Sequence, residues 1–332
     1  MMKIIFFSAL IYDKDFFIQQ NRSLGLELVF HESQLTEKTV GLIDQAEAVC
    51  VFVNDTLNAA VCKQLALKGI KIIALRCAGF NNVDLEAAKL NGLKVCRVPA
   101  YSPEAVAEHA LALVLTLNRK THKAYNRVRE QNFSLNGLLG FNLNGKTVGV
   151  IGTGNIGKVF CKIMLGIGSK VLAFDLIANK ELEAIGVEYH PLVKVLQADI
   201  VSLHCPMNEQ TKHIIDDTTI SLMKKGVMLI NTSRGGLIDT KAAIEGLKSG
   251  QIGYLGIDVY EQEEHLFFRD LSNTVIQDDE IQRLMSFPNV LVTAHQAFFT
   301  DEALGQIAMI TLNNVIQLLK KGNLTNQAAL LV

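Results

Sequence analysis

Short apolar runs typical of strands alternate with amphipathic helical segments along most of the chain, and this alternation limits the fold more than any other feature. Strands separated by helices of this length form βαβ units, which build parallel sheets. Two series of such runs are visible. The first contains Ile4–Leu10, Glu27–Phe30, Ala48–Val53, Ile70–Leu75 and Leu93–Arg97. The second contains Thr147–Ile151, Val171–Phe174, Ile200–Leu203, Val227–Ile230, Gly253–Ile257 and Val290–Thr293.

A break after the first series predicts a hinge between two domains, which suits a length of 332 residues. Ser102-Pro103-Glu104 supplies an N-cap, a proline for the first turn and an early acid, so we expect a long helix from there to about Arg129. The tail Asp301–Leu319 has the periodicity of a helix with one buried face. Because the first series lacks a closing helix, we expect the tail to return to it. The predicted domains are 1–100 plus 299–332, and 101–298, with a cleft between them.

Composition excludes several classes of protein. The formal net charge is −1, so no global field attracts nucleic acid or an anionic membrane. Six cysteines occur without a Cys-x-x-Cys pair, which favours reduced thiols in a cytoplasmic chain. The run Lys3–Tyr12 is followed by Asp13 and Asp15 and is better interpreted as a buried strand than as a signal peptide. We predict neither a metal site nor a membrane span.

A glycine-rich segment marks a cofactor site. Gly152-Thr153-Gly154-Asn155-Ile156-Gly157 follows a strand and opens a helical stretch, which is the setting of a dinucleotide-binding turn. Gly152 allows the tight turn, Gly154 lets backbone amides approach a pyrophosphate, and Gly157 lets helix and strand pack closely. Asp175, 18 positions past Gly157, would accept hydrogen bonds from ribose hydroxyls and repel a 2′-phosphate. NAD is therefore favoured over NADP; the alternative is a glycine-rich turn with a surface aspartate.

Three strands of the second series lead to side chains suited to acid–base chemistry. Arg234, Glu263 and His295 each follow a different strand. Because ligands bind beyond the carboxyl ends of parallel strands, we expect the three to converge on one rim with the glycine turn. Hydride transfer to a 2-oxo acid needs three such groups. They are a cation that binds the substrate carboxylate, an acid that protonates the carbonyl oxygen, and a group that adjusts the pKa of this acid. Singly, each has an ordinary alternative, namely a solvated cation, an exposed acid and a structural histidine.

Several separated motifs, in order, resemble the D-isomer-specific 2-hydroxyacid dehydrogenase family. They are Arg76-Cys-Ala-Gly-Phe-Asn-Asn-Val-Asp84, Val98-Pro-Ala-Tyr-Ser-Pro-Glu-Ala-Val-Ala-Glu-His109, Gly152–Gly157, Asn231-Thr-Ser-Arg-Gly235, Asp258-Val-Tyr-Glu-Gln-Glu263 and His295-Gln-Ala-Phe298. The resemblance covers about residues 2 to 330. It implies two doubly wound parallel-sheet α/β domains, a flavodoxin-like substrate domain and a Rossmann NAD-binding domain. We expect NAD as cofactor, a small 2-oxo or 2-hydroxy acid as substrate, and a homodimer or homotetramer.

The resemblance also assigns roles to single residues. Arg234 resembles the family's substrate-binding arginine, His295 its acid/base and Glu263 the carboxylate that stabilises the imidazolium of that histidine. The other expected substrate-binding residues are Ala78, Gly79, Tyr101 and Phe298, together with Phe52, which is otherwise plain core. The expected cofactor-binding residues are Gly152, Thr153, Gly154, Asn155, Ile156, Gly157, Asp175, Cys205, Pro206, Thr232 and Asp258, of which Asp258 has a structural strand-end role as its alternative.

The spacing between Glu263 and His295 favours lactate as the hydroxy acid. The 31 residues between them form a longer interval than is typical of the glycerate and phosphoglycerate branches, where a proline directly follows the glutamate; here that position is Glu264. We therefore expect NADH-dependent reduction of pyruvate to D-lactate. The alternatives are another small D-2-hydroxy acid, or an NADH-responsive corepressor that binds protein partners. No added tail, basic cluster or disordered arm supports the corepressor, and NADH oxidation on adding pyruvate discriminates between the two.

Overall fold

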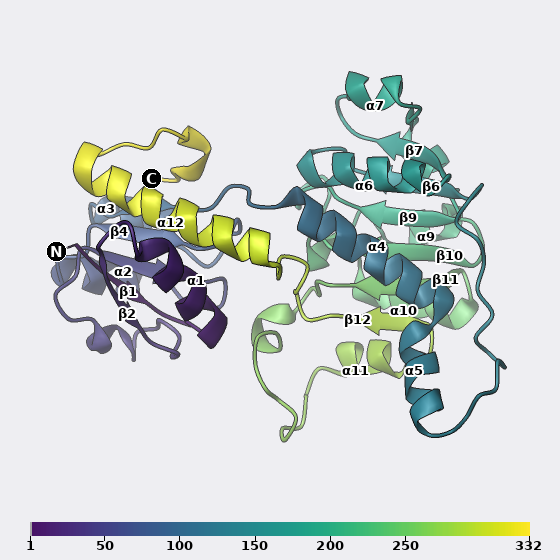
Figure 1. The fold of residues 1–332 in the computed structure, drawn as a ribbon, viewed down its shortest axis with the longest axis horizontal. Coiled ribbons are helices and arrows are strands. Elements are labelled where there is room, and N and C mark those ends of the chain that lie inside the picture. Colours follow the sequence, from purple (N-terminus) through teal and green to yellow (C-terminus); the bar gives the residue numbers. More distant parts are fainter. Residues whose placement is uncertain (1) are drawn as a thin grey trace. The chain divides into compact units, whose positions relative to one another are not determined.

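The computed structural model describes residues 2–332, apart from the side chain of His265. The chain divides into two units, Met1–Ser102 with Phe299–Val332, and Pro103–Phe298. Each unit is built on one sheet in which every strand pair is parallel. Two doubly wound α/β sheets were expected, and both are present (Figure 1). Over the described residues, no helix has the length and apolar character needed to cross a membrane.

The first unit has a five-stranded sheet in the order β2-β1-β3-β4-β5. Its strands are β1 (Lys3–Phe6), β2 (Glu27–Phe30), β3 (Ala48–Val51), β4 (Ile72–Leu75) and β5 (Lys94–Cys96). Its α-helices are α1 (Ile11–Asn21), α2 (Ala59–Leu67), α3 (Leu85–Leu90) and α12 (Asp301–Lys321). Ile4, Ile5 and Phe6 are all fully buried, so helices must cover both faces of the sheet.

Helix α12 completes the core of the first unit. Thr300 caps its N-terminus by accepting a hydrogen bond from the Ala303 amide. The helix packs along α1 and against β4 and β5. Its apolar face is buried, as the sequence period predicts, and contributes Leu304, Ile307, Ala308, Thr311, Leu312, Val315 and Leu318. The side chains of α12 therefore share one core with Phe6 and Phe17, which come from the other end of the chain.

The second unit has a seven-stranded sheet in the order β12-β11-β10-β9-β6-β7-β8. Its strands are β6 (Thr147–Ile151), β7 (Lys170–Phe174), β8 (Glu188–Tyr189), β9 (Ile200–Leu203), β10 (Val227–Asn231), β11 (Ile252–Ile257) and β12 (Val290–Val292). Its α-helices are α4 (Pro103–Arg119), α5 (Thr121–Arg129), α6 (Asn155–Gly166), α7 (Lys180–Ala184), α8 (Leu192–Val195), α9 (Asp217–Leu222), α10 (Thr240–Ser249) and α11 (Asp279–Ser286). α4 and α6 contribute to the core on one face of the sheet, and α9, α10 and α11 to the core on the other.

The register of this sheet aligns the strand ends that lead to the predicted site. Ile151 pairs with Leu203, Leu203 with Asn231, Asn231 with Ile257, and Ile257 with Val292. The residues that follow these five strands therefore start from one line along the carboxyl edge. β6 and β9 are neighbours although the chain passes from β6 to β7, so the direction of winding reverses between them. Ligands of doubly wound sheets bind at such a reversal.

The predicted helix from Pro103 to about Arg129 is wrong in one respect, because the structure divides it. α4 ends at Arg119, and Lys120 adopts a left-handed conformation with φ 51° before α5 begins at Thr121. Lys120 Nζ donates to Leu139 O at 2.5 Å. This contact forms because the segment after α5 passes close to Lys120. The basic residues Lys123, Arg127 and Arg129 lie on α5, a cluster that the sequence argument against a corepressor overlooked. Strand β8 was also missed, since two residues are too short to show a period.

Candidate active site

The glycine turn joins β6 to α6 in a conformation that needs glycine at two positions. Gly152 has φ 92°, and a Cβ there would lie 2.5 Å from the backbone nitrogen of Cys205. A Cβ on Gly157 would clash with the carbonyl oxygen of Gly152. By contrast, nothing lies within 4 Å of a Cβ placed on Gly154, the residue before α6. The space beside Gly154, at the start of this 12-residue helix, is thus open, and a helix N-terminus with open space beside it suits a pyrophosphate.

Asp175 is held beside this turn by hydrogen bonds. One carboxylate oxygen accepts from the Thr153 backbone nitrogen at 2.6 Å and from Thr153 Oγ1 at 3.0 Å, and the other accepts from the Leu176 nitrogen at 2.7 Å. Burial raises the pKa of Asp175, but these hydrogen bonds outweigh it and hold the pKa below its usual value. Asp175 is therefore ionised at neutral pH, which opposes a 2′-phosphate. Tyr189 on β8 donates to Thr153 Oγ1 at 2.9 Å and supports the same group. Sequence reasoning missed Tyr189, because its only local signal is an aromatic residue near a short apolar run.

Two further predicted cofactor residues lie on the neighbouring strand ends. Cys205 packs its backbone against Gly152, and its carbonyl accepts a hydrogen bond from Ser233 Oγ at 2.7 Å. Thr232 follows β10, and its buried hydroxyl has no hydrogen-bond partner among residues 2–332. A buried hydroxyl without a partner is costly unless a ligand supplies one. The open glycine turn, the ionised Asp175 and this hydroxyl fit the pyrophosphate, ribose and amide groups of a dinucleotide.

His295 and Glu263 form a hydrogen-bonded pair. His295 Nδ1 lies 2.9 Å from one carboxylate oxygen of Glu263, whose other oxygen accepts from the Tyr260 backbone nitrogen at 2.8 Å. Because an ionised carboxylate only accepts hydrogen bonds, the ring proton lies on Nδ1. Nε2 of His295 has no hydrogen-bond partner in the part of the chain that the structure describes. Both side chains are 22% exposed, so the free nitrogen is accessible to a small molecule.

Arg234 lies on the loop after β10. Asn231 fixes this loop, because its side-chain nitrogen donates to Arg234 O at 2.8 Å and its side-chain oxygen accepts from the Ser233 nitrogen at 3.0 Å. The guanidinium donates through Nη1 to the Ser233 carbonyl at 2.7 Å. Within residues 2–332 it forms no ion pair with a carboxylate, so the other N–H groups in the guanidinium plane remain available to bind an anion.

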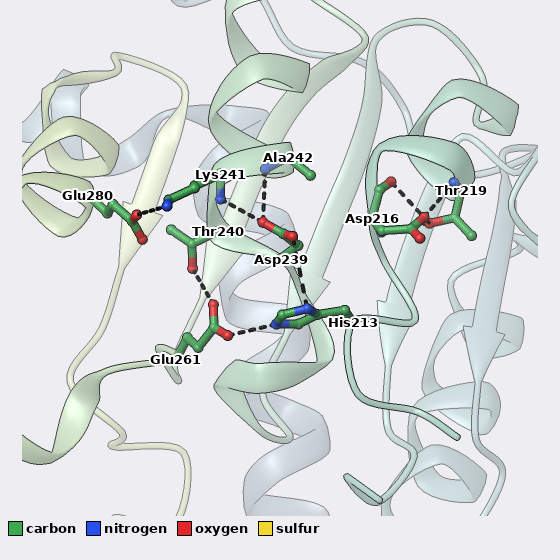
Figure 2. Close-up of polar contacts among 9 residues, drawn as sticks. All are labelled: His213, Asp216, Thr219, Asp239, Thr240, Lys241, Ala242, Glu261 and Glu280. Atoms are coloured by element: carbon green, nitrogen blue, oxygen red, sulfur yellow. Dashed lines mark hydrogen bonds and ion pairs between the residues drawn. The ribbon is translucent and has the colours of Figure 1, made fainter. Parts of the chain in front are cut away.

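A cluster of polar side chains ties the Arg234 loop to the Glu263 loop (Figure 2). His213 Nε2 lies 2.6 Å from Glu261, which also accepts from Thr240 Oγ1 at 3.2 Å. The backbone nitrogen of His213 donates to Gly236 O at 2.8 Å. A Cβ on Gly235 would clash with the backbone of Tyr260 and Glu261, so the two loops are in backbone contact. Sequence reasoning missed His213, because nothing local connects it to residues 48 positions away.

Asp258 is fully buried, and its carboxylate accepts hydrogen bonds from other residues of the protein. One oxygen accepts from Thr293 Oγ1 at 2.5 Å and from the Gln296 nitrogen at 2.9 Å, and the other accepts from the Ala297 nitrogen at 2.9 Å. Its position behind the His295 turn fits the structural role that was the alternative to cofactor binding. A direct contact with a cofactor would require these hydrogen bonds to change.

The predicted substrate residues belong to both units. The loop after β4 carries Ala78, whose carbonyl accepts from Arg97 Nη1 at 2.8 Å, and Gly79, whose carbonyl accepts from Cys77 Sγ at 3.3 Å. Phe52 follows β3, is buried, and lies 4.8 Å from the guanidinium carbon of Arg76. Tyr101 is half-buried in the first unit, and Phe298 is buried in the second.

Comparison with known proteins places the chain in one family. The family model described as "D-isomer specific 2-hydroxyacid dehydrogenase, NAD binding domain" matches residues 111–297. A "2-hydroxyacid dehydrogenase homolog 1" of Schizosaccharomyces pombe is 55% identical over 324 residues, which are 97% of this chain and 98% of that protein. A "D-lactate dehydrogenase" of Escherichia coli is 52% identical over 327 residues, which are 98% of this chain and 99% of that protein. The apo-structure of D-lactate dehydrogenase from Escherichia coli matches with a TM-score of 0.92 and 49% identity over 100% of both chains.

The chain therefore belongs to the D-isomer specific 2-hydroxyacid dehydrogenase family, as the sequence motifs indicate. It is an oxidoreductase that acts on 2-hydroxyacids, and its cofactor is NAD.

Proposed function

We propose that this enzyme reduces pyruvate to D-lactate with NADH, and catalyses the reverse reaction. The hydrogen bond between His295 and Glu263 carries the proposal, because it leaves Nε2 accessible on the sheet edge that also holds Arg234 and the glycine turn. The relative named D-lactate dehydrogenase supports lactate as the product.

Each member of the site has a separate task in this reaction. Arg234 binds the substrate carboxylate through the N–H groups in its guanidinium plane and polarises the ketone. NADH, when bound, supplies the hydride that reduces the keto carbon. His295, protonated on both nitrogens, gives the proton on Nε2 to the keto oxygen and is left neutral, while Glu263 stabilises the imidazolium through Nδ1. In the reverse direction neutral His295 takes that proton back. The cofactor is held by the glycine turn, Asp175 and Thr232.

The remaining predicted residues would shape the substrate pocket. We propose that the amides of Ala78 and Gly79 bind the substrate carboxylate, and that Tyr101 and Phe298 close over the substrate. The Phe52 ring, held against Arg76, would restrict the side chain of the 2-oxo acid to a methyl group. The domain division 1–100 plus 299–332, and 101–298, then corresponds to a substrate domain and an NAD-binding domain.

A substrate panel tests this proposal. Purified protein with NADH is assayed against pyruvate, 2-oxobutyrate, hydroxypyruvate and a branched 2-oxo acid, and the product is resolved by chiral chromatography. We expect the highest kcat/KM with pyruvate and a D-product. Preference for another acid would make the enzyme a dehydrogenase of that D-2-hydroxy acid, and an L-product would contradict the proposed geometry.

We also propose that the enzyme is a cytoplasmic homodimer or homotetramer. Phe133, Leu135 and Leu139, in the segment after α5, expose apolar side chains that a second copy of the chain would cover. All six cysteines are free and buried, in keeping with a reducing compartment. Light scattering on the purified protein checks the assembly, and a monomer at micromolar concentration would contradict it.

A further inference from the structure

The turn that carries His295 is held in an unfavourable backbone conformation. His295 has φ 53°, in the left-handed region that favours glycine. A non-glycine residue remains there only if its surroundings hold it. Asp258 supplies three of the bonds that do so: its carbonyl accepts from the His295 nitrogen at 2.7 Å, and its carboxylate accepts from the nitrogens of Gln296 and Ala297.

Asp258 depends in turn on a histidine from another element. α4 packs across β10, β11 and β12, and His109 on this helix places Nε2 3.3 Å from a carboxylate oxygen of Asp258 and 3.1 Å from Thr293 Oγ1. Thr293 gives its only hydroxyl proton to Asp258, so its oxygen can only accept from His109. Both neighbours of Nε2 are therefore acceptors, and Nε2 must carry a proton.

This contact is nearly closed to water. The side chain of His109 is 15% exposed and that of Asp258 is fully buried. Burial raises the pKa of Asp258, but the hydrogen bonds from His109, Thr293 and the Ala297 nitrogen lower it below its usual value. Asp258 is thus kept ionised, and an ionised carboxylate is the stronger acceptor for the two amides that follow His295.

We propose that His109 is a positioning residue for the reaction: through Asp258 and Thr293 it holds the turn that keeps the His295 ring on Glu263. His109 itself touches neither substrate nor cofactor in this role. The inference rests on the proposed function of His295 as the acid/base. In metal sites, mutation of a residue that hydrogen-bonds to a ligand typically lowers activity by roughly 10- to 100-fold. We expect a loss of activity of similar size when His109 is replaced.

Two substitutions test the proposal in the full-length enzyme. His109→Leu removes the N–H donor, whereas His109→Gln keeps one near the position of Nε2. Glu108→Gln is the matched control, since Glu108 is the exposed neighbour on α4. We expect His109→Leu to lower kcat by about 10-fold or more while KM and the NADH Kd change less than about threefold, and His109→Gln to restore most of the loss. Equal losses in both variants, or an unchanged kcat in His109→Leu, would overturn the positioning role.

A second measurement does not depend on activity. The ring-proton NMR signals of His295, assigned by their loss in His295→Gln, are compared in cofactor-free wild type, His109→Leu and His109→Gln. We expect the signals to move in His109→Leu and to return in His109→Gln; unmoved signals in His109→Leu would overturn the proposal. If His295→Gln keeps full turnover, the proton role fails, while the NMR comparison still decides whether His109 positions the ring.

Discussion

At the scale of single residues, the position of the proton on the His295 ring is set by the hydrogen bond to Glu263. Glu263 fixes the proton on Nδ1, so only Nε2 is left to exchange a proton with a substrate. A residue with this task affects the chemical step rather than the binding of cofactor.

We predict that His295→Gln lowers kcat on the order of 10² or more and leaves NADH affinity nearly unchanged. Steady-state kinetics and NADH fluorescence titration measure the two quantities. The pH profiles of the wild type give an independent check: because keto-acid reduction takes up a proton and hydroxyacid oxidation releases one, a rise in pH should slow reduction and speed oxidation. Equal losses of turnover and NADH affinity, or parallel pH profiles, would assign His295 a structural role.

We expect Asp175 to select NADH over NADPH. Its carboxylate is ionised and fixed by Thr153 and Leu176, so a 2′-phosphate would meet an immobile negative charge. We predict that Asp175→Ala reduces the ratio of kcat/KM with NADH to kcat/KM with NADPH by roughly tenfold or more, about 1.4 kcal/mol. Glu181→Gln, which alters an exposed carboxylate on α7, serves as the control. An unchanged ratio in Asp175→Ala would remove this residue from the cofactor site.

His204 makes the stability of the folded chain depend on pH. It is buried beside Ser202 Oγ, and burial lowers the pKa of its ring from 6.5 to about 3. The folded protein keeps His204 neutral where the unfolded chain takes up a proton, so this contribution is complete above pH 6.5 and is lost as the pH falls toward 3. Between pH 6 and 4 the loss amounts to roughly 2–3 kcal/mol. We predict that the free energy of unfolding of His204→Gln falls by that amount less than the wild-type value between pH 6 and 4, as measured by urea unfolding. Equal falls in the two proteins would contradict a neutral buried ring.

At the scale of elements, the loops after β9, β10 and β11 act as one assembly. A hydrogen bond between His213 and Glu261 joins the loops after β9 and β11 (Figure 2). Gly235 permits the backbones of the loops after β10 and β11 to touch. Arg234 and Glu263 lie on two of these loops, so their spacing depends on the junction.

We predict that Glu261→Gln raises KM for the 2-oxo acid by roughly threefold to tenfold, because the loss of about 0.7–1.4 kcal/mol of hydrogen bonding loosens the Arg234 loop. Glu280→Gln is the control: Glu280 lies 3.7 Å from Lys241, whose side chain is 83% exposed, and an ion pair of this kind contributes little. Steady-state kinetics separate the two variants. Identical KM values for both would show that the junction does not position Arg234.

The elements themselves could be predicted from the sequence where the signal is local. Apolar runs located eleven of the twelve strands that the structure describes in residues 2–332, and the glycine turn marked the end of β6. The break at Lys120 could not be predicted, since it carries no glycine or proline and its side chain bonds to Leu139 from a later loop. The contacts of His109 with Thr293 and of Arg76 with Asp13 span 184 and 63 positions, and such pairs depend on the finished sheets.

At the scale of the whole molecule, α12 joins the end of the chain to the core of the first unit. Leu312 is fully buried there. We predict that Leu312→Ala destabilises the first unit by about 2–5 kcal/mol, the usual cost of a cavity in a packed core. Met309→Ala on the same helix, at a position 44% exposed, should cost far less. Urea unfolding followed by circular dichroism checks this, and equal effects would show that α12 does not stabilise that core.

The return of α12 also has a consequence for protein synthesis. A ribosome translates β1–β5 first, then the entire second unit, and only then the helix whose side chains complete the apolar cluster around Phe6 and Phe17. The middle of the polypeptide is contiguous and can fold as soon as it emerges, whereas the part made earliest must wait for the part made last. During that interval one apolar face of the first sheet lacks its final cover, and we expect nascent chains stalled before Asp301 to be bound by chaperones at β1–β5.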